Sequence, residues 1–313
     1  MAFLATCSSV GIYILDDQIR LTPWVYTQLA IMGVVELTDR NPKKVTSGVI
    51  IILSGIYIWS GIQKLNSGFL YDTLPWMLSA FSEGDFVRPE TIPDWYLMVP
   101  IGELLVGVFL FTRLRVLGFI GGILMHVAIL LILGPFGHDW NHVVWPWNVS
   151  HIFILIWLWF NKDQISMAGL FKVRSNLVVG FLFFLMPVLN FFNMLDEPFS
   201  ASMYSGTADQ VGIYFNTYEE ELPNQYIIEY GLPYTDENGN YKEDMTWIVY
   251  WTMDELRLPD YAADRYYYAL GRKMCKGFRN HQSSGLEIIR KDKFTAAMHT
   301  ERCSCEKLLE EAD

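Results

Sequence analysis

Residues 45–69 read VTSGVIIILSGIYIWSGIQKLNSGF, and this stretch decides the fold. Its apolar run of about 20 residues matches the ~30 Å hydrocarbon core of a bilayer, so it predicts a membrane-spanning helix. Lys64 lies at the end of the run. Because an ionisable residue is unfavourable inside a membrane, Lys64 is a candidate functional residue. Alternatively, its long stem carries the ammonium group to the lipid headgroups as an interfacial anchor.

The charges of the chain are segregated. The protein has 313 residues, of which 52% are hydrophobic, and a mean hydropathy of +0.21. Residues 1–193 have a net charge of −1, whereas residues 194–313 have a net charge of −10. This contrast predicts a transmembrane helical bundle over 1–193 and an acidic extramembrane domain over 194–313. The acidic domain excludes a nucleic-acid partner, because such a partner requires basic surface.

Apolar segments predict a mainly α, polytopic transmembrane bundle. One segment carries Pro23 and Glu36, and another is short unless it begins in the preceding loop. Residues 2–15 are uncharged but short for a span, so they are a half-span or the remainder of a longer helix; no basic segment marks a cleavable signal peptide. The predicted spans are Leu21–Thr38, Val45–Gly61, Trp95–Phe111, Val116–Leu133, Val149–Phe160 and Leu177–Phe192.

The loops between these segments predict the orientation of the bundle. Three alternate loops carry eight basic residues: Arg40, Lys43, Lys44, Arg113, Arg115, Lys162, Lys172 and Arg174. The intervening loops carry only Lys64 and Arg88. Because basic loops stay in the cytoplasm, this asymmetry places the protein in the cytoplasmic (inner) membrane with Lys64 and the C-terminal domain outside the cytoplasm.

Two further ionisable residues lie inside predicted spans. Glu103 and His126 each lie eight residues from the outer end of their helix, which is about 12 Å at 1.5 Å per residue. Equal depth on consecutive helices predicts that they share a hydrogen bond or a proton. Together with Lys64 they are the candidate catalytic residues, lining one cavity that faces outward. In the alternative interpretation Glu103 and His126 only brace two helices, which is worth about 0.6–2 kcal/mol.

The loop at 135–151, PFGHDWNHVVWPWNVSH, is expected to cover this cavity. Its tryptophans are typical of the membrane interface. Trp145, Trp147 and His151 are the candidate residues for holding a cofactor. His138 and His142 have the spacing of two metal ligands on one helix face, but the Gly, Pro and Asn content favours a loop, so no metal site is predicted.

The segments SGIQKLNSGFLYDTLPWMLS, IGELLVG and GILMHVAILLILG together resemble the DoxX/MauE superfamily of small four-helix membrane proteins. Within it, residues 45–160 look most like the horizontally transferred transmembrane domain, which also forms the membrane part of vitamin K-dependent gamma-carboxylases. In those enzymes a motif Ala-Gly-Val-Lys-Lys-Leu-Asp carries a lysine proposed to deprotonate the reduced quinone. Gly61-Ile62-Gln63-Lys64-Leu65-Asn66 is similar: Lys64 falls on the second lysine, and Gln63 replaces the first.

The C-terminal domain is predicted to be a small α+β domain. Val211–Phe215 and Gly285–Arg290 are predicted strands, and Asp236-Glu237-Asn238-Gly239 is a turn signal. Residues 247–254 fit a strand or a helix. Further helices are expected from Pro259 to about Lys276 and after Ser304. Cys275 is expected to form a disulfide with Cys303 or with Cys305. Alternatively, all three cysteines remain reduced.

Three functions fit these observations. In the first, which the resemblance favours, the bundle binds a lipid-soluble quinone-like molecule or supports redox chemistry outside the cytoplasm. In the second, the protein is a carboxylase-like membrane enzyme with Lys64 as general base. In the third, it is a non-catalytic scaffold that presents its acidic domain to a membrane or extracytoplasmic protein. The first two predict an apolar cavity beside Lys64, Glu103 and His126, and the scaffold predicts tight packing.

Overall fold

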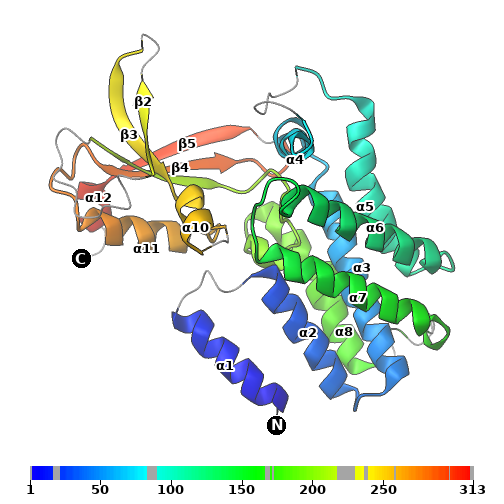
Figure 1. Ribbon diagram of the computed structural model, residues 1–313. Helices are drawn as coiled ribbons and strands as arrows, with labels where there is room; N and C mark the ends of the chain where they lie inside the picture. The colour runs from blue at the N-terminus through cyan, green and yellow to red at the C-terminus, as the bar shows by residue number, and fades with distance from the viewer. Residues whose placement is uncertain are drawn as a thin grey trace. The chain divides into compact units, whose positions relative to one another are not determined.

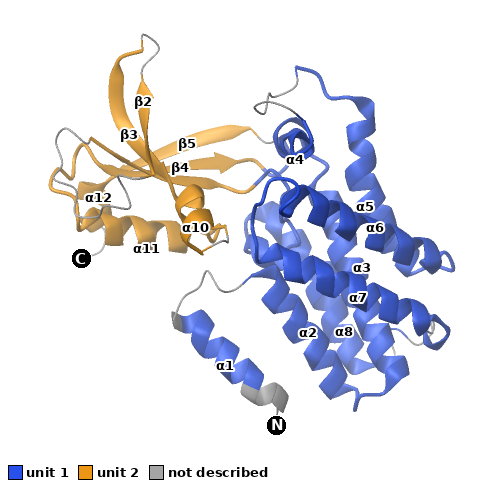
Figure 2. Ribbon diagram, in the orientation of Figure 1, with its two compact units in different colours: residues 1–207, 293–296 blue, residues 208–292, 297–313 orange. Residues whose placement is uncertain are grey.

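The chain folds into two compact units, shown in Figures 1 and 2. The first unit comprises residues 1–207 with 293–296, and the second comprises 208–292 with 297–313. The charge pattern predicted a boundary at 193/194, whereas in the structure residues 194–207 belong with the helical unit. The computed structural model describes residues 2–16, 22–82, 90–165, 170, 173–216, 230–235, 239–256, 259–295 and 297–310. Leu21, Arg88, Lys172 and residues 236–238 of the predicted turn lie outside these ranges.

The first unit is helical, and its helices coincide with the predicted apolar segments to within a few residues, except that α7 begins earlier and α4 lies in a segment that was predicted to be a loop. Helix α7 begins at Val144, inside the preceding loop, and has 17 residues. The helices are α1 (Ala2–Asp16), α2 (Pro23–Leu37), α3 (Pro42–Gln63), α4 (Leu74–Ser79), α5 (Met98–Leu110), α6 (Arg115–Leu133), α7 (Val144–Phe160) and α8 (Arg174–Gly180). The short turns are η2 (Phe69–Thr73), η3 (Asp94–Leu97), η4 (Lys162–Gln164), η6 (Phe181–Leu185), η7 (Met186–Phe192) and η8 (Glu197–Phe199).

Three helical segments of the described chain are long and apolar enough to cross a membrane. They are Pro42–Gln63, Arg115–Leu133 and Arg174–Phe192, the last formed by α8, η6 and η7. Val144–Phe160 is apolar but shorter. The structure thus agrees with the apolar helical character of the predicted bundle and gives three membrane-length helices where the sequence predicted six spans.

Helix α3 is the centre of the first unit, packed against α2, α5 and α8. It begins where the Asn41 side chain accepts a hydrogen bond from the Lys44 amide and Pro42 occupies the first turn, a favourable start for a helix. Its apolar side chains from Val49 to Leu53 are almost fully buried. In Figure 1, α3 lies between α8 and the α5–α6 pair. The stretch that decides the fold is therefore the core of the bundle.

Small residues allow the helices to approach closely. A Cβ atom at Gly61 would lie 2.6 Å from the Pro100 carbonyl oxygen and 2.7 Å from the Leu104 nitrogen of α5. A Cβ at Gly107 of α5 would likewise lie 2.9 Å from the Ser54 carbonyl oxygen of α3. These atoms are backbone and cannot move aside, so the glycines set the distance between α3 and α5.

We expect Gly61→Ala to destabilise the bundle by about 1–3 kcal/mol, because α5 must shift to admit the methyl group. Gly102→Ala on α5 is the matched control, since a Cβ there meets nothing within 4 Å. Thermal unfolding of both variants in detergent, followed by circular dichroism, measures the difference. Equal melting temperatures for the two variants would show that the α3–α5 distance does not depend on Gly61.

Side-chain contacts gather the loops of the first unit at two ends of the bundle. At one end, the basic end, Arg115 donates hydrogen bonds to the carbonyl oxygens of Lys162 and Ile165, so two of the basic loops lie together. At the other end, the Lys64 end, hydrogen bonds connect the loops that meet there. Asn66 donates to the Ser205 carbonyl oxygen at 2.9 Å, and Asn141 donates to the Tyr204 hydroxyl at 2.9 Å.

The second unit is built on an antiparallel five-stranded sheet with the order β2-β3-β1-β4-β5. Its strands are β1 (Gln210–Phe215), β2 (Gly231–Thr235), β3 (Tyr241–Trp247), β4 (Gly285–Lys291) and β5 (Met298–Ser304), and its helices are α10 (Ile248–Leu256), α11 (Asp264–Cys275) and α12 (Cys305–Glu310). Gly212 of β1 is opposite Trp247 of β3 and Glu287 of β4. Alternate residues such as Ile213 and Leu286 therefore share one face and pack with Tyr267 of α11.

The predicted strands at 211–215 and 285–290 and the final helix are confirmed. Residues 248–256 are helical, which decides the segment that fitted either a strand or a helix. The helix expected from Pro259 starts later, at Asp264, because Ala263 is extended.

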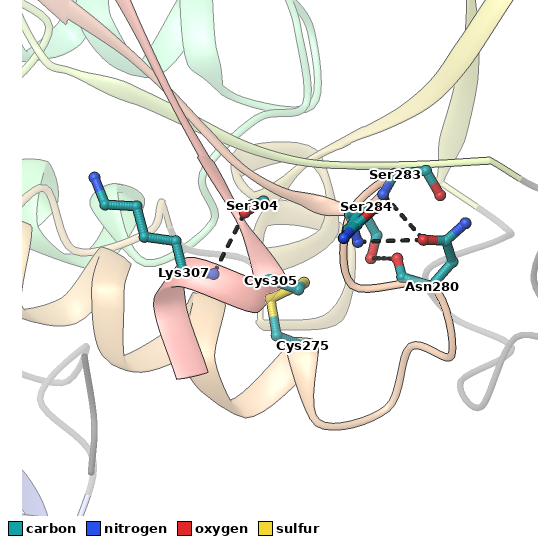
Figure 3. Close-up of a disulfide and its surroundings, with 8 residues drawn as sticks. Cys275, Asn280, Ser283, Ser284, Ser304, Cys305 and Lys307 are labelled. Carbon is teal, nitrogen blue, oxygen red and sulfur yellow. Dashed lines mark hydrogen bonds between the residues drawn. A yellow bond between two sulfur atoms is a disulfide. The ribbon is translucent and has the colours of Figure 1, made fainter. Parts of the chain in front are cut away.

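A disulfide joins the end of α11 to the start of α12 (Figure 3). Cys275 bonds to Cys305, with their Cα atoms 5.1 Å apart, and both residues are fully buried. Cys303 is buried on β5 and lies outside this bond. Of the states that the sequence left open, the structure thus contains the Cys275–Cys305 bridge.

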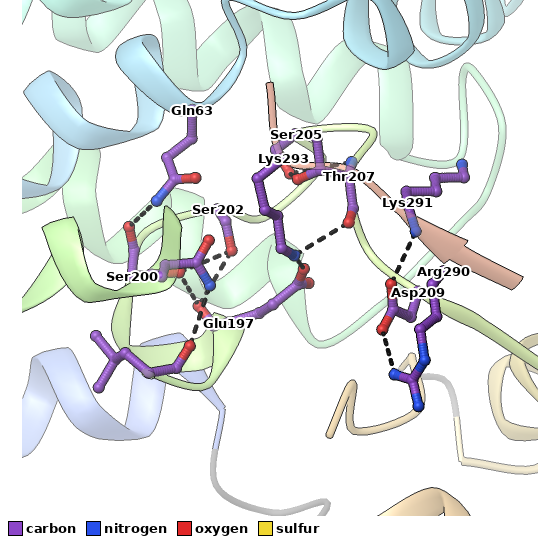
Figure 4. Close-up of polar contacts among 12 residues, drawn as sticks. Gln63, Glu197, Ser200, Ser202, Ser205, Thr207, Asp209, Arg290, Lys291 and Lys293 are labelled. Atoms are coloured by element: carbon purple, nitrogen blue, oxygen red, sulfur yellow. Dashed lines mark hydrogen bonds and ion pairs between the residues drawn. The ribbon is translucent and has the colours of Figure 1, made fainter. Parts of the chain in front are cut away.

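A partly exposed ion cluster connects α11 to the sheet. Tyr268 donates a hydrogen bond of 2.6 Å to Glu301, and Arg290 pairs with Glu301 at 3.0 Å and with Asp264 at 2.7 Å. Arg290 also reaches Asp209, as Figure 4 shows. The hydrogen bond from Tyr268 and the charge of Arg290 lower the pKa of Glu301 below its ordinary value of 4.5. Burial and the bond to Glu301 raise the pKa of Tyr268 to about 12.

These shifts predict an acid-sensitive second unit. Because the folded pKa of Glu301 is lowered, its ionised form stabilises the fold above pH 4.5, and this stabilisation is lost as the pH falls through the folded value. We expect the urea midpoint of the full-length protein to fall between pH 6 and pH 3, and to fall less in Glu301→Gln. If both proteins lose the same amount, Glu301 does not contribute to the acid sensitivity.

Candidate functional site

The first unit contains a pocket that is partly open to solvent. Lys64, Glu103 and His126 all line it, so the predicted candidate residues share one cavity. Most of the remaining wall is apolar or aromatic. It is formed by Pro23, Tyr26, Thr27, Gly55, Ile56, Tyr57, Ser60, Met125, Ile129, Val144, Trp147, Asn148, Phe183, Pro187, Pro198, Phe199, Ala201, Met203 and Tyr204.

Lys64 forms a buried ion pair with Glu103. Lys64 is the C-cap residue of α3, and its side chain bonds back to Ser60, four residues earlier. Its Nζ donates to Glu103 Oε2 at 2.7 Å and to Ser60 Oγ at 2.5 Å. The side chains of Lys64 and Glu103 are only 11% and 12% exposed. Lys64 therefore points into the bundle, which is contrary to the interpretation of a simple interfacial anchor.

His126 has both ring nitrogens occupied. Tyr57 on α3 lies 2.8 Å from Nε2, and the Asn148 side-chain oxygen on α7 lies 2.7 Å from Nδ1. His126, Tyr57 and Asn148 are at most 2% exposed. The predicted hydrogen bond between His126 and Glu103 is therefore wrong. Glu103 pairs with Lys64, and the ring nitrogens of His126 are hydrogen-bonded to Tyr57 and Asn148.

Three polar residues of the pocket wall come from one face of α3. Tyr57, Ser60 and Lys64 are spaced i, i+3 and i+7, so their side chains lie on the same side of the helix. We did not predict Tyr57, Ser60 or Asn148 as site residues. The i, i+3, i+7 spacing on α3, and an asparagine within the apolar α7, were the signals in the sequence that pointed to them.

The three candidate cofactor residues are placed differently on α7. Trp147 lines the pocket, whereas Trp145 donates to the Leu133 carbonyl oxygen at 2.9 Å and is outside the lining. His151 lies one turn along α7 from Trp147 and is outside the pocket lining. Its Nδ1 donates a hydrogen bond to the Trp147 carbonyl oxygen at 2.9 Å. Its ring centroid is 5.0 Å from that of His126.

Two buried nitrogens beside the pocket have no hydrogen-bond partner among the described residues: Trp147 Nε1 and His151 Nε2. Because a buried polar atom normally finds a partner, each points to a water molecule or a ligand atom. Trp147 Nε1 is a donor only, so its partner must be an acceptor. Of the two, Trp147 is the one in the pocket wall.

The remaining histidines of the loop serve the packing of the Lys64 end. His138 bonds to the Trp76 carbonyl oxygen at 2.7 Å and stacks on the Trp76 ring at 4.4 Å. Trp76 also stacks on Tyr204, a pocket residue, at 6.5 Å. His142 pairs with Asp139 instead. Among the residues that the structure describes, no group of three or more histidines, cysteines or carboxylates could hold a metal ion.

Residues 196–207 form one wall of the pocket and are fastened at several points (Figure 4). Gln63, next to Lys64, donates to the Ser200 carbonyl oxygen at 3.2 Å. Lys293 pairs with Glu197 at 2.6 Å and bonds to the Thr207 carbonyl oxygen. Ala201 and Tyr204 have positive φ angles of 58°, which L residues rarely adopt. The wall is thus held in a strained conformation by its neighbours.

Comparison with models of protein families, with curated proteins and with solved structures finds no match to this chain. The resemblance of residues 45–160 to the DoxX/MauE superfamily stays a prediction from the sequence motifs.

Proposed function

We propose that this chain is a multi-pass membrane protein whose helical unit binds a lipid-soluble, quinone-like molecule. The observation that carries the proposal is the pocket, which has apolar walls and two polar donors with spare N–H groups for which the described residues offer no acceptor. One donor is Trp147 Nε1. The other is the third N–H of Lys64, whose first two bond to Ser60 and Glu103.

A quinone fits this combination chemically. Its ring and hydrocarbon tail suit an apolar, aromatic wall, and its two carbonyl oxygens are acceptors without donors. Ligand pockets are typically apolar with a few placed polar groups, and the wall of this pocket has that composition.

The surface of the helical unit supports a membrane location. Large apolar side chains are exposed along α6, α7, α8 and η6, and a water-soluble protein rarely has so extended an apolar surface. These side chains are Leu117, Ile120, Leu124, Val127, Leu131, Val149, Phe153, Ile156, Trp157, Phe160, Leu177, Val178, Phe181 and Leu185. We infer that they contact lipid, with the basic end toward the cytoplasm. The Cys275–Cys305 disulfide supports an extracytoplasmic second unit, because disulfides persist outside the cytoplasm.

The two other functions have less support. A pure scaffold predicts tight packing, whereas the bundle contains a pocket. A general base at Lys64 would have to be a neutral amine, which would give up the ion pair with Glu103. The ion pair instead suits Lys64 to hold an oxygen atom of a ligand.

The test is to identify what the purified protein carries. We expect organic extraction followed by mass spectrometry to recover a quinone-like lipid in amounts approaching one per chain. Ile129→Trp, which fills the pocket from α6, should remove it. Leu124→Trp is the matched control, because Leu124 lies on the same helix but is 63% exposed.

The result would contradict the proposal if the quinone content were the same in both variants, or if the wild type carried only bulk phospholipid.

A further inference from the structure

The basic residues of the second unit are concentrated on α11 and the turn that follows it. The unit, residues 208–292 with 297–313, contains 11 Lys and Arg against 20 Asp and Glu, a net charge of −9. Residues 265–279 hold five of these basic residues and no acid, so the rest of the unit has a net charge of −14. The five, here called the basic stripe, are Arg265, Arg272, Lys273, Lys276 and Arg279.

Helix geometry places the stripe on the side of α11 that faces away from the sheet. The residues at 265, 269, 272 and 276 follow one another at intervals of four and three, so they share one face of the helix. The opposite face holds Tyr267, Gly271 and Cys275, which are buried against the sheet. Arg265 and Lys276 are exposed, and the helix between them spans about 16 Å at 1.5 Å per residue.

Ion pairs within the unit do not account for the stripe. Arg272, Lys273 and Lys276 form no ion pair with any residue that the structure describes, whereas the arginines of β4 and β5 each pair with carboxylates. Unpaired and solvent-facing cations on one surface form a positive field, which attracts a partner of opposite charge.

The helix dipole accounts for only part of the stripe. The dipole favours cations in the last turn, which suits Arg272 and Lys273, but it disfavours a cation in the first turn, where Arg265 lies. Like charges three and four residues apart also destabilise a helix. The stripe therefore works against the stability of α11 by itself, which is the expected cost of a binding surface.

We propose that the basic stripe binds the headgroups of anionic phospholipids at the membrane surface. Clusters of four to eight Lys and Arg on a helix are typical of such binding. The net charge of −14 over the rest of the unit would be repelled by the same headgroups, so the charges also determine which face of the unit meets them. Because the apolar side of α11 is packed against the sheet, the helix lies on the headgroups and does not insert.

A membrane is the anionic surface that this chain brings with it. The chain passes between the two units after Thr207 and again on either side of residues 293–296. The helical unit exposes the apolar side chains that we infer contact lipid, so phospholipid headgroups are at high local concentration for the second unit. The inference rests on the membrane location within the proposed function, but not on the quinone-like ligand.

The test uses the full chain in nanodiscs of phosphatidylcholine, alone or mixed with phosphatidylglycerol. A dye is attached to Ala269→Cys in the middle of the stripe, with Cys7→Ser to remove another accessible thiol. Nitroxide groups on the lipid headgroups quench the dye when the stripe contacts them. We expect more quenching with phosphatidylglycerol at low salt, and loss of this difference at high salt, because salt screens charges at a surface.

The variant Arg272→Gln/Lys276→Gln should lower the ratio of bound to free stripe about 25-fold, since each cation near an anionic surface contributes about fivefold. The matched control is Lys242→Gln/Lys307→Gln, which removes two exposed cations from β3 and α12 and should keep the quenching. The quinone content of the same samples should not change, because these residues lie outside the pocket.

Equal quenching in the two lipid compositions, or an equal loss in both double variants, would overturn the inference. Stripe-dependent binding of polyglutamate without any effect of lipid composition would also overturn it, and would assign the stripe to an acidic protein. If no quinone is recovered but the lipid-dependent quenching persists, the ligand part of the proposed function fails and this inference stands.

Discussion

Glu103→Leu is expected to destabilise the helical unit by about 3–5 kcal/mol, the range for breaking a buried ion pair from one side. The reason is that Lys64 would remain in the apolar pocket wall with only the Ser60 hydroxyl as partner. Reversible unfolding of the purified protein in mixed detergent micelles measures the change. Glu103→Gln, which keeps the shape and an acceptor oxygen, should lose less.

The double variant Lys64→Met/Glu103→Leu is the decisive comparison. Because it removes both charges, it should be more stable than Glu103→Leu alone, even though it carries one more substitution. If the two changes simply add, the ion pair does not couple α3 to α5.

The same logic predicts that His126→Leu leaves the Tyr57 hydroxyl without its partner, so that His126→Leu/Tyr57→Phe recovers part of the lost stability.

The second large effect concerns orientation. A reporter enzyme that is active only outside the cytoplasm should be fully active when it is fused after Asp313. The same reporter fused after Lys162, within a basic loop, should be inactive. The expected contrast is nearly all-or-none, because the eight basic residues of these alternate loops act together.

Activity of the fusion after Lys162 but not of the fusion after Asp313 would reverse the topology. It would also remove the argument that the Cys275–Cys305 disulfide reflects an oxidising compartment. Cell extracts made with a thiol-blocking reagent provide an independent control, since they report whether the native chain carries the disulfide.

The helices of the first unit could be predicted because hydrophobic segments of sufficient length have few structures other than a helix open to them. The run at 45–61 became the buried core of the bundle, since its apolar side chains and small residues suit close packing on all sides. The shared pocket followed from helix geometry, because Lys64, Glu103 and His126 lie near the same end of three helices.

The partners within the pocket could not be predicted from depth alone. Glu103 and His126 are near in depth, but Tyr57 and Asn148 occupy both nitrogens of the imidazole, and the flexible stem of Lys64 reaches Glu103. Depth along a helix gives no information on which face a side chain occupies, and the pairing depends on those faces.

In the second unit, β5 was missed because its sequence MHTERCS is mostly polar and lacks the alternation of a half-buried strand. It is an edge strand, paired only with β4, and few of its side chains are buried. The choice between Cys303 and Cys305 was also beyond the sequence, because it depends on where β5 ends and α12 begins.

The most direct test of the central claim is to map where a quinone binds. A photoreactive azido-quinone with a short alkyl chain is irradiated with the purified full chain, and the labelled peptides are identified by mass spectrometry. The account predicts saturable labelling at pocket residues such as Met125, Phe183 and Met203, and its loss in Ile129→Trp. Labelling that is unsaturable and concentrated on the exposed residues Leu117, Leu124 and Phe153 would show partition into the surrounding detergent and contradict a binding site in the bundle.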